Sequence, residues 1–169
     1  LSGLIPTTPY IVYLVGQEGQ TGTGKVQAAT TNIAFTTVDF TPPTFVKAAV
    51  PAVSESDASV VAALNERGVV WYVVAEASAN ANPSSLDVQA GRADSGAGGA
   101  TGVAVVSKGT IDMSSGLVGR DVSGTVTGLI ATHMYDVFLV GRDVHLNMMV
   151  KPTKVAFTAP DQTPPVFTA

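Results

Sequence analysis

The chain has 169 residues, a formal net charge of −4, and 13% charged against 46% hydrophobic residues. This length is sufficient for one domain with a buried core, or for one domain and parts of its neighbours. The low charge content excludes a disordered charged tail, and the acidic balance argues against binding of nucleic acid or anionic lipid through bulk positive charge. The absence of cysteine excludes disulfides and thiolate metal sites. No apolar run approaches the length of a membrane span.

Residue usage predicts an all-β fold. The sequence contains 26 Val and 19 Thr, which favour pleated surfaces, and 17 Gly and 10 Pro, which separate short apolar segments. No segment has a convincing helical stripe of apolar residues. In chain order we expect strands at residues 10–16, 33–37, 45–49, 58–64, 69–75, 103–112, 118–129, 135–141 and 154–158. The first of these is apolar on both faces, which is typical of a strand covered on both sides.

One segment differs in composition from the rest. In residues 77–102, Ala, Gly, Ser and Asn make up 18 of 26 positions. Within it, residues 83–91 are compatible with one helical turn, with a serine as N-cap and Gly91 at the C-terminal cap. The glycine-rich remainder, residues 94–102, is predicted to be a flexible surface loop.

An internal repeat determines the expected organisation. Residues 1–16 align without gaps on residues 126–141 with 9 of 16 identities, and residues 31–45 align on residues 153–167 with 9 of 15. The offsets are 125 and 122 residues, so the length difference lies in a loop between the two blocks.

The repeat predicts three parts joined by linkers. We expect the last strands of one module in residues 1–40, a complete module in 44–161, and a linker and the start of a next module in 162–169. An isolated hairpin is marginal in water, so the first part requires completion by upstream sequence or by another chain. Since the chain also lacks an initiator Met, we expect it to be part of a longer protein.

Residues 4–12, LIPTTPYIV, resemble the fibronectin type III family. In that family the pattern L-x-P-x-T-x-Y-x-V precedes and enters the penultimate strand, and all five specified residues are present. The later copy keeps Leu129, Tyr135 and Val137 but has Ala131 and His133. The resemblance implies tandem antiparallel β-sandwiches, fibronectin type III-like or immunoglobulin-like, one complete and one partial. In these, Tyr10 and Tyr135 would form tyrosine corners, with the ring in the core and the hydroxyl bonded to the preceding turn.

Two features depart from the fibronectin type III pattern. The single tryptophan, Trp71, lies in a predicted central strand, as in immunoglobulin-like sandwiches. The module also exceeds the roughly 100 residues typical of such sandwiches, because it carries the segment 77–102. Residues 64–74, residues 83–91 and the D-x-T-P-P boundary look like tandem repeats of large surface proteins of bacteria and algae.

Three groups of residues invite a chemical interpretation. Residues 19–25, GQTGTGK, match the phosphate-binding pattern G-x-x-x-x-G-K, but Val26 supplies no hydroxyl for Mg²⁺ and no helix is expected to follow.

His133 and His145 lie near Asp136 and Asp143, at opposite ends of a predicted strand, and are expected to be solvated loop residues. Asp39 and Asp161 precede the Thr-Pro-Pro segments, but one carboxylate per junction is too few for calcium. We therefore expect no catalytic, cofactor or metal site.

The two linkers, Thr41-Pro42-Pro43 and Thr163-Pro164-Pro165, are predicted to be short, semi-rigid spacers. Thr41 and Thr163, each next to proline, are candidate O-glycosylation sites.

These features together favour a structural and adhesive repeat segment of a large extracellular or cell-surface glycoprotein that forms a stalk, coat or filament. Its partners would be neighbouring modules, copies of itself and glycans. A glycan- or protein-binding module, or an accessory domain of a secreted enzyme, is an alternative. The segment itself is not expected to be an enzyme, because no convergent acid, base and nucleophile are visible.

Overall fold

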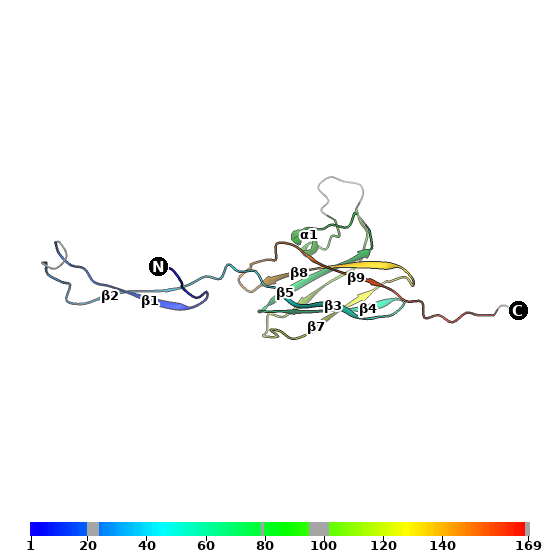
Figure 1. Ribbon diagram of the computed structural model, residues 1–169, viewed down its shortest axis with the longest axis horizontal. Helices are drawn as coiled ribbons and strands as arrows, with labels where there is room; N and C mark the ends of the chain where they lie inside the picture. Colours follow the sequence, from blue (N-terminus) through cyan, green and yellow to red (C-terminus); the bar gives the residue numbers. More distant parts are fainter. Residues whose placement is uncertain (20–23, 79, 95–101, 168–169) are drawn as a thin grey trace. The chain divides into compact units, whose positions relative to one another are not determined.

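The structure is a computed structural model that describes residues 1–19, 24–78, 80–94 and 102–167 (Figure 1). The chain divides into two units, Leu1–Phe40 and Thr41–Ala169. Antiparallel strands dominate the described residues, which contain one short helix, so the all-β prediction is confirmed. No helix in the described ranges has the length and apolar character needed to cross a membrane.

The first unit is built on one hairpin. Strand β1 (Pro9–Leu14) pairs with β2 (Thr31–Thr36), from Pro9 opposite Thr36 to Leu14 opposite Thr31. Among the described residues of this unit there is no second layer, and large apolar side chains on both faces stay about half exposed.

The second unit contains seven strands in two sheets (Figure 1). One sheet has the order β3–β4–β7, formed by β3 (Phe45–Val53), β4 (Asp57–Leu64) and β7 (Val122–Thr127). The other has the order β6–β5–β8–β9, formed by β6 (Val105–Asp112), β5 (Gly68–Glu76), β8 (Met134–Asp143) and β9 (Thr153–Thr158). In the constant-type immunoglobulin sandwich the fourth strand joins the sheet of the first, second and fifth strands. Here the fourth strand, β6, pairs with β5 instead.

The main core lies between these two sheets. On β8, Tyr135, Val137 and Leu139 are fully buried at alternate positions. Gly141 continues this face, and a Cβ added there would lie 3.0 Å from Leu64 Cδ2 on β4. The alternation of strand side chains therefore places odd-numbered residues of β8 against the opposite sheet.

Tyr72 links the two sheets at a position where no long side chain stands opposite it. Its hydroxyl donates to the Thr125 carbonyl on β7 at 2.7 Å, and burial raises the pKa of the Tyr72 phenol. Gly109 and Gly124 leave room for the ring, because a Cβ at either position would lie within 2.6 Å of a Tyr72 atom. Trp71, the preceding residue, points to the outer face, where the Arg142 guanidinium lies 4.9 Å from its ring centroid.

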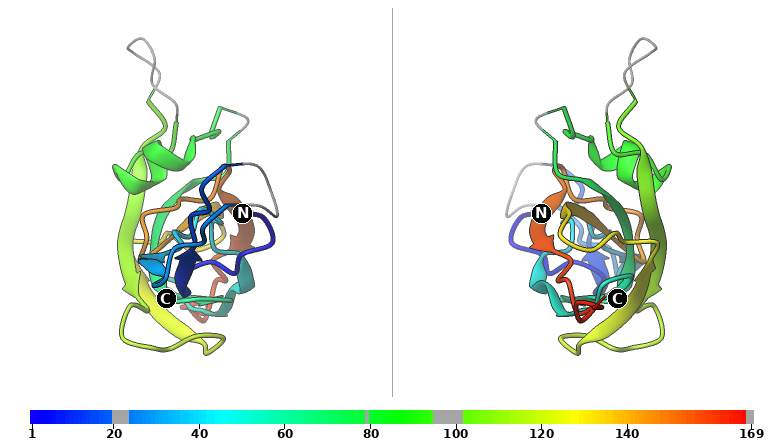
Figure 2. Two further views of the ribbon diagram at one scale, coloured as in Figure 1. Left: turned by 90° about the vertical axis from the view of Figure 1, so that its left-hand side faces the viewer. Right: turned by 90° about the vertical axis from the view of Figure 1, so that its right-hand side faces the viewer.

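A third layer covers the outer face of the four-stranded sheet. Val73, Phe138 and Val140 point away from the other sheet but are at most 5% exposed. The segment between β5 and β6 returns over them, and its helix α1 (Ser85–Gln89) contacts β5 and β8 (Figure 2). Val88 of α1 belongs to the same buried cluster.

Local sequence explains why α1 forms. Ser84 is the N-cap, and the Asp87 amide donates to its hydroxyl oxygen while the Asp87 carboxylate accepts from the Ser84 amide. Ala90 caps the C-terminus, and Gly91 follows with a φ of +76° in the left-handed region. This helix lies within the predicted helical turn. The predicted loop 94–102 lies mostly outside the described residues, which omit 95–101.

Some strand boundaries differ from the prediction. Strand β3 continues beyond residue 49 to Val53, and it accommodates Pro51 because the register shifts between Ala49 and Ala52 at this sheet edge. Strand β7 begins at Val122 rather than 118, since the preceding residues form turns that carry Gly116 and Gly119 at positive φ.

Candidate functional site

Both units contain the same tyrosine hydrogen bond. In the first unit the Ile5 amide donates to the Tyr10 hydroxyl at 2.9 Å, and in the second the Ile130 amide donates to the Tyr135 hydroxyl at 2.8 Å. Each hydroxyl thus accepts from the residue five positions earlier, in the turn before its strand. The backbone of each turn is closed by a threonine in the left-handed region, Thr7 with φ 53° and Thr132 with φ 68°.

The hairpins that follow have the same register along their paired strands. Pairing starts with Pro9 opposite Thr36 in one unit and Met134 opposite Thr158 in the other. Tyr10 stacks on Phe35 with ring centroids 5.9 Å apart, and Tyr135 stacks on Phe157 at 5.5 Å. Nearer the hairpin tips, isolated bridges join Gln17 to Val26 and Arg142 to Met148. All these pairs obey the sequence offsets of 125 and 122 residues.

The hairpin tips contain the length difference. Glu18 donates its amide to the Lys25 carbonyl, and the equivalent bond runs from Asp143 to Asn147, which leaves six residues at one tip and three at the other. In the second unit the Asp143 carboxylate holds the short tip by accepting from the His145 and Asn147 amides, both at 2.8 Å. The phosphate-loop-like segment is the longer tip, and four of its residues, 20–23, lie outside the described residues.

The two histidines lie before and after β8, and both are exposed. His133 Nδ1 is 3.1 Å from Glu76 Oε1. Asp136 is buried on β8, and Lys154 Nζ lies 2.7 Å from its Oδ2, while Asp143 holds the loop tip. The structure thus places both aspartates in local contacts of the fold and the two histidines at opposite ends of one strand.

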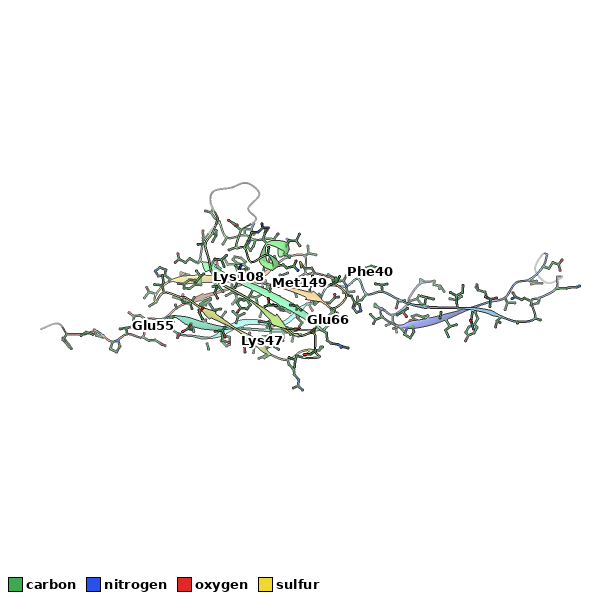
Figure 3. All side chains as sticks on the ribbon, turned by 180° about the vertical axis from the view of Figure 1, so that it is seen from behind. Phe40, Lys47, Glu55, Glu66, Lys108 and Met149 are labelled. Atoms are coloured by element: carbon green, nitrogen blue, oxygen red, sulfur yellow. The ribbon has the colours of Figure 1, made fainter. Side chains whose placement is uncertain are left out.

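The chain enters and leaves the second unit at opposite ends of the sandwich. Pro43 is buried, and the Thr44 amide donates to Asn65 Oδ1 in the β4–β5 turn at 2.7 Å. At the other end, in the β3–β4 turn, Glu55 accepts from the Thr163 hydroxyl at 2.8 Å and from the Gln162 amide. Figure 3 shows Glu55 and Glu66, which mark these two turns, at the two ends of the unit.

The proline linkers therefore differ in their surroundings. Pro43 is buried in the second unit and Pro42 is half-buried, whereas Pro164 and Pro165 are exposed. Thr41 and Thr163 are both exposed, and the Thr163 hydroxyl is engaged by Glu55.

The third layer creates two hollows that the sequence patterns do not reveal. A groove of about 780 Å³ lies between the insertion and the β8–β9 hairpin, lined by Phe138, Lys151 and Lys154 together with Ser78, Asn82 and Ser84. A smaller hollow of about 320 Å³ lies beside α1, lined by Trp71, Lys108 and Gln89. A cation of the protein already lies near each ring, since Lys154 Nζ is 5.8 Å from the Phe138 centroid and Arg142 lies over Trp71. The hollows thus offer cationic and hydrogen-bonding groups rather than a bare aromatic platform.

Comparison with known proteins assigns no family to the chain. No protein-family model matches the sequence. No curated protein matches it either.

Proposed function

We propose that this chain is a structural and adhesive repeat segment of a large extracellular or cell-surface protein, in which fibronectin type III-like sandwiches follow one another as a stalk, coat or filament. The observation that carries this proposal is the equivalence of the two hairpins in tyrosine hydrogen bond, register and ring stacking. Equivalent hairpins that recur after one module length, here 125 residues for the first strand and 122 for the second, are the expected signature of tandem modules.

The first unit then represents the end of a preceding sandwich. Leu14 is 46% exposed, whereas its counterpart Leu139, in the core of the second unit, is fully buried. Similarly Val12 is half-buried while Val137 is fully buried. Burial of such side chains is the main favourable term in folding, so these residues favour completion of the hairpin by the strands that precede it in a module.

The ends of the second unit suit a string of modules. The chain enters this unit beside the β4–β5 turn and leaves it beside the β3–β4 turn, so the two linkers attach at opposite ends of the sandwich. The exposed Pro164 and Pro165 act as a stiff spacer to the next module, and repetition of such units gives reach and multivalency. Thr41 and Thr163, both exposed, remain the candidate O-glycosylation sites, and glycopeptide analysis of the natural protein tests them.

Electron microscopy of the whole natural protein, combined with limited proteolysis, tests this function. We expect strings of globular modules, and cleavage at the linkers around residues 41 and 163, 122 residues apart. A single compact particle without repeating modules, cleaved at unrelated positions, would contradict the proposal.

A second candidate function is ligand binding at the groove lined by Phe138, Lys151 and Lys154. Its volume of about 780 Å³ lies within the range of ligand pockets. Binding of an acidic glycan that is lost in Lys151→Ala and Lys154→Ala, with the fold retained, would favour this function.

A further inference from the structure

The outer face of β1 is apolar and uncovered among the described residues. It consists of Ile11 and Tyr13, with Val15 just beyond the strand, and these are 54%, 64% and 54% exposed. The inner face, which carries Tyr10 and Leu14, belongs to the core of the expected sandwich. In an antiparallel sandwich with two layers the outer face is normally polar, because water covers it.

On the equivalent, outer face of β8 the corresponding side chains are buried. The counterparts of Ile11, Tyr13 and Val15 are Asp136, Phe138 and Val140, which are only 2%, 5% and 0% exposed. They too point away from the sheet β3–β4–β7. The segment that links β5 to β6 covers Phe138 and Val140, and its helix α1 contacts β5 and β8 (Figure 2). Asp136 on the same face pairs with Lys154 of β9.

We propose that the outer face of β1 is likewise covered by a helix-bearing segment, inserted between two strands of the preceding module. This inference rests on the proposed function, because it assumes that β1 and β2 end a sandwich. The third layer is then a general feature of the repeat rather than an addition to the second unit.

The residues of the first unit also indicate the chemistry of the cover. In the second unit Asp136 pairs with Lys154. The equivalent positions of the first unit are Ile11 and Asn32, so neither charge of this ion pair is present there. A segment that meets Ile11, Tyr13 and Val15 therefore presents small apolar side chains, as Val88 and Ala81 do in the second unit. A charged side chain there would be desolvated without a partner.

The strand topology favours the same polypeptide as the source of the segment that covers β1. In the second unit, β5 pairs with β8 and leads directly into the insertion. The corresponding edge of β1 is unpaired among the described residues. A strand of the preceding module that pairs with this edge would deliver the covering segment immediately after it.

Radical labelling of tyrosines tests the two claims separately, because Tyr10 and Tyr13 lie on opposite faces of β1. The labelling is compared by peptide mass spectrometry between this 169-residue chain and the whole natural protein. Tyr72 and Tyr135, which are 4% and 0% exposed, serve as internal controls for buried rings. In the whole protein we expect Tyr13 labelling to fall toward that of Tyr72, a change approaching the 16-fold ratio of their exposed fractions, 64% and 4%.

Each other outcome is decisive. Protection of Tyr10 with Tyr13 still labelled would overturn the proposed covering segment over β1 and leave the proposed function intact. Labelling of both tyrosines in the whole protein would contradict the proposed function as well. Protection of Tyr13 that disappears on dilution would identify a second copy as the cover and overturn the assignment to the same polypeptide.

Discussion

The Tyr72 hydroxyl donates a 2.7 Å hydrogen bond to the carbonyl of Thr125, so one side chain connects the two sheets of the second unit. The ring reaches β7 because Gly109 and Gly124 have no side chain. The two glycines are therefore part of the core, where an added methyl group would collide with the Tyr72 ring.

Gly124→Ala should lower the free energy of unfolding by about 1–3 kcal/mol, the usual cost of overpacking a core. The new Cβ would lie 2.6 Å from Tyr72 Cε1, and the hydrogen bond to Thr125 restricts the ring's escape. Urea unfolding followed by the fluorescence of Trp71, the single tryptophan, reports on the second unit. Gly102→Ala is the control, because among the described residues the nearest atom to its added Cβ is 3.6 Å away. Equal stabilities of the two variants would refute the prediction.

Tyr135→Phe should lower the free energy of unfolding of the second unit by about 1 kcal/mol, because the Ile130 amide loses its acceptor. The matched change, Tyr10→Phe, removes the equivalent bond from the first unit and should leave the Trp71 transition unchanged in this chain. In the whole natural protein, Tyr10→Phe should instead destabilise the preceding module by a similar amount. An unchanged transition in Tyr135→Phe would show that the corner does not stabilise the sandwich.

The capping box of α1 should make stability depend on pH in the acid range. The hydrogen bond from the Ser84 hydroxyl, aided by Arg92, holds the pKa of Asp87 below its ordinary value of 3.8. A carboxyl with a lowered folded-state pKa contributes stability above its unfolded pKa, and this contribution is lost as the pH falls through the folded-state pKa. Below about pH 4 the free energy of unfolding, measured with urea, should therefore fall less with decreasing pH in Asp87→Asn than in the unsubstituted chain.

Ser84→Ala provides a matched pair with Ser85→Ala at neutral pH. The first should lower the free energy of unfolding by about 1 kcal/mol through loss of the N-cap. The second should leave the free energy of unfolding unchanged, because the buried Ser85 hydroxyl has no hydrogen-bond partner among the described residues. The reverse order of stabilities would argue against the capping box.

Glu55→Ala should loosen the C-terminal linker. The Gln162 amide donates to this carboxylate, so its hydrogen exchange, followed by NMR, should accelerate roughly fivefold, as expected for the loss of about 1 kcal/mol. Glu66→Ala, at the opposite end of the unit, should leave Gln162 exchange unchanged. Equal exchange in both variants would mean that Glu55 does not hold the linker.

The strands, α1 and the equivalence of the hairpins were accessible from sequence because their signals are local. Runs of Val and Thr favour strands, and Ser84, Asp87 and Gly91 provide the start and stop of α1 within a few residues. Identical residues at the same spacing likewise produced the same tyrosine hydrogen bond in both units.

The third layer of the second unit and the two hollows beside it could be recognised only from the structure. The run around Trp71 is apolar at every position, so its pattern did not distinguish the outward Trp71 from the inward Tyr72. The cover itself consists largely of small residues such as Ala81 and Ala93, whose burial depends on where the segment folds back. Lys151 and Lys154 meet Asn82 only through that return, which no sequence spacing encodes.

Amide hydrogen exchange of β1 in the whole natural protein shows whether the first unit ends a complete sandwich. We expect the β1 amides directed away from β2 to be protected as strongly as the corresponding amides of β8, which pairs with strands on both edges. Exchange of those β1 amides at the rate of an unstructured chain, while β8 remains protected, would contradict it.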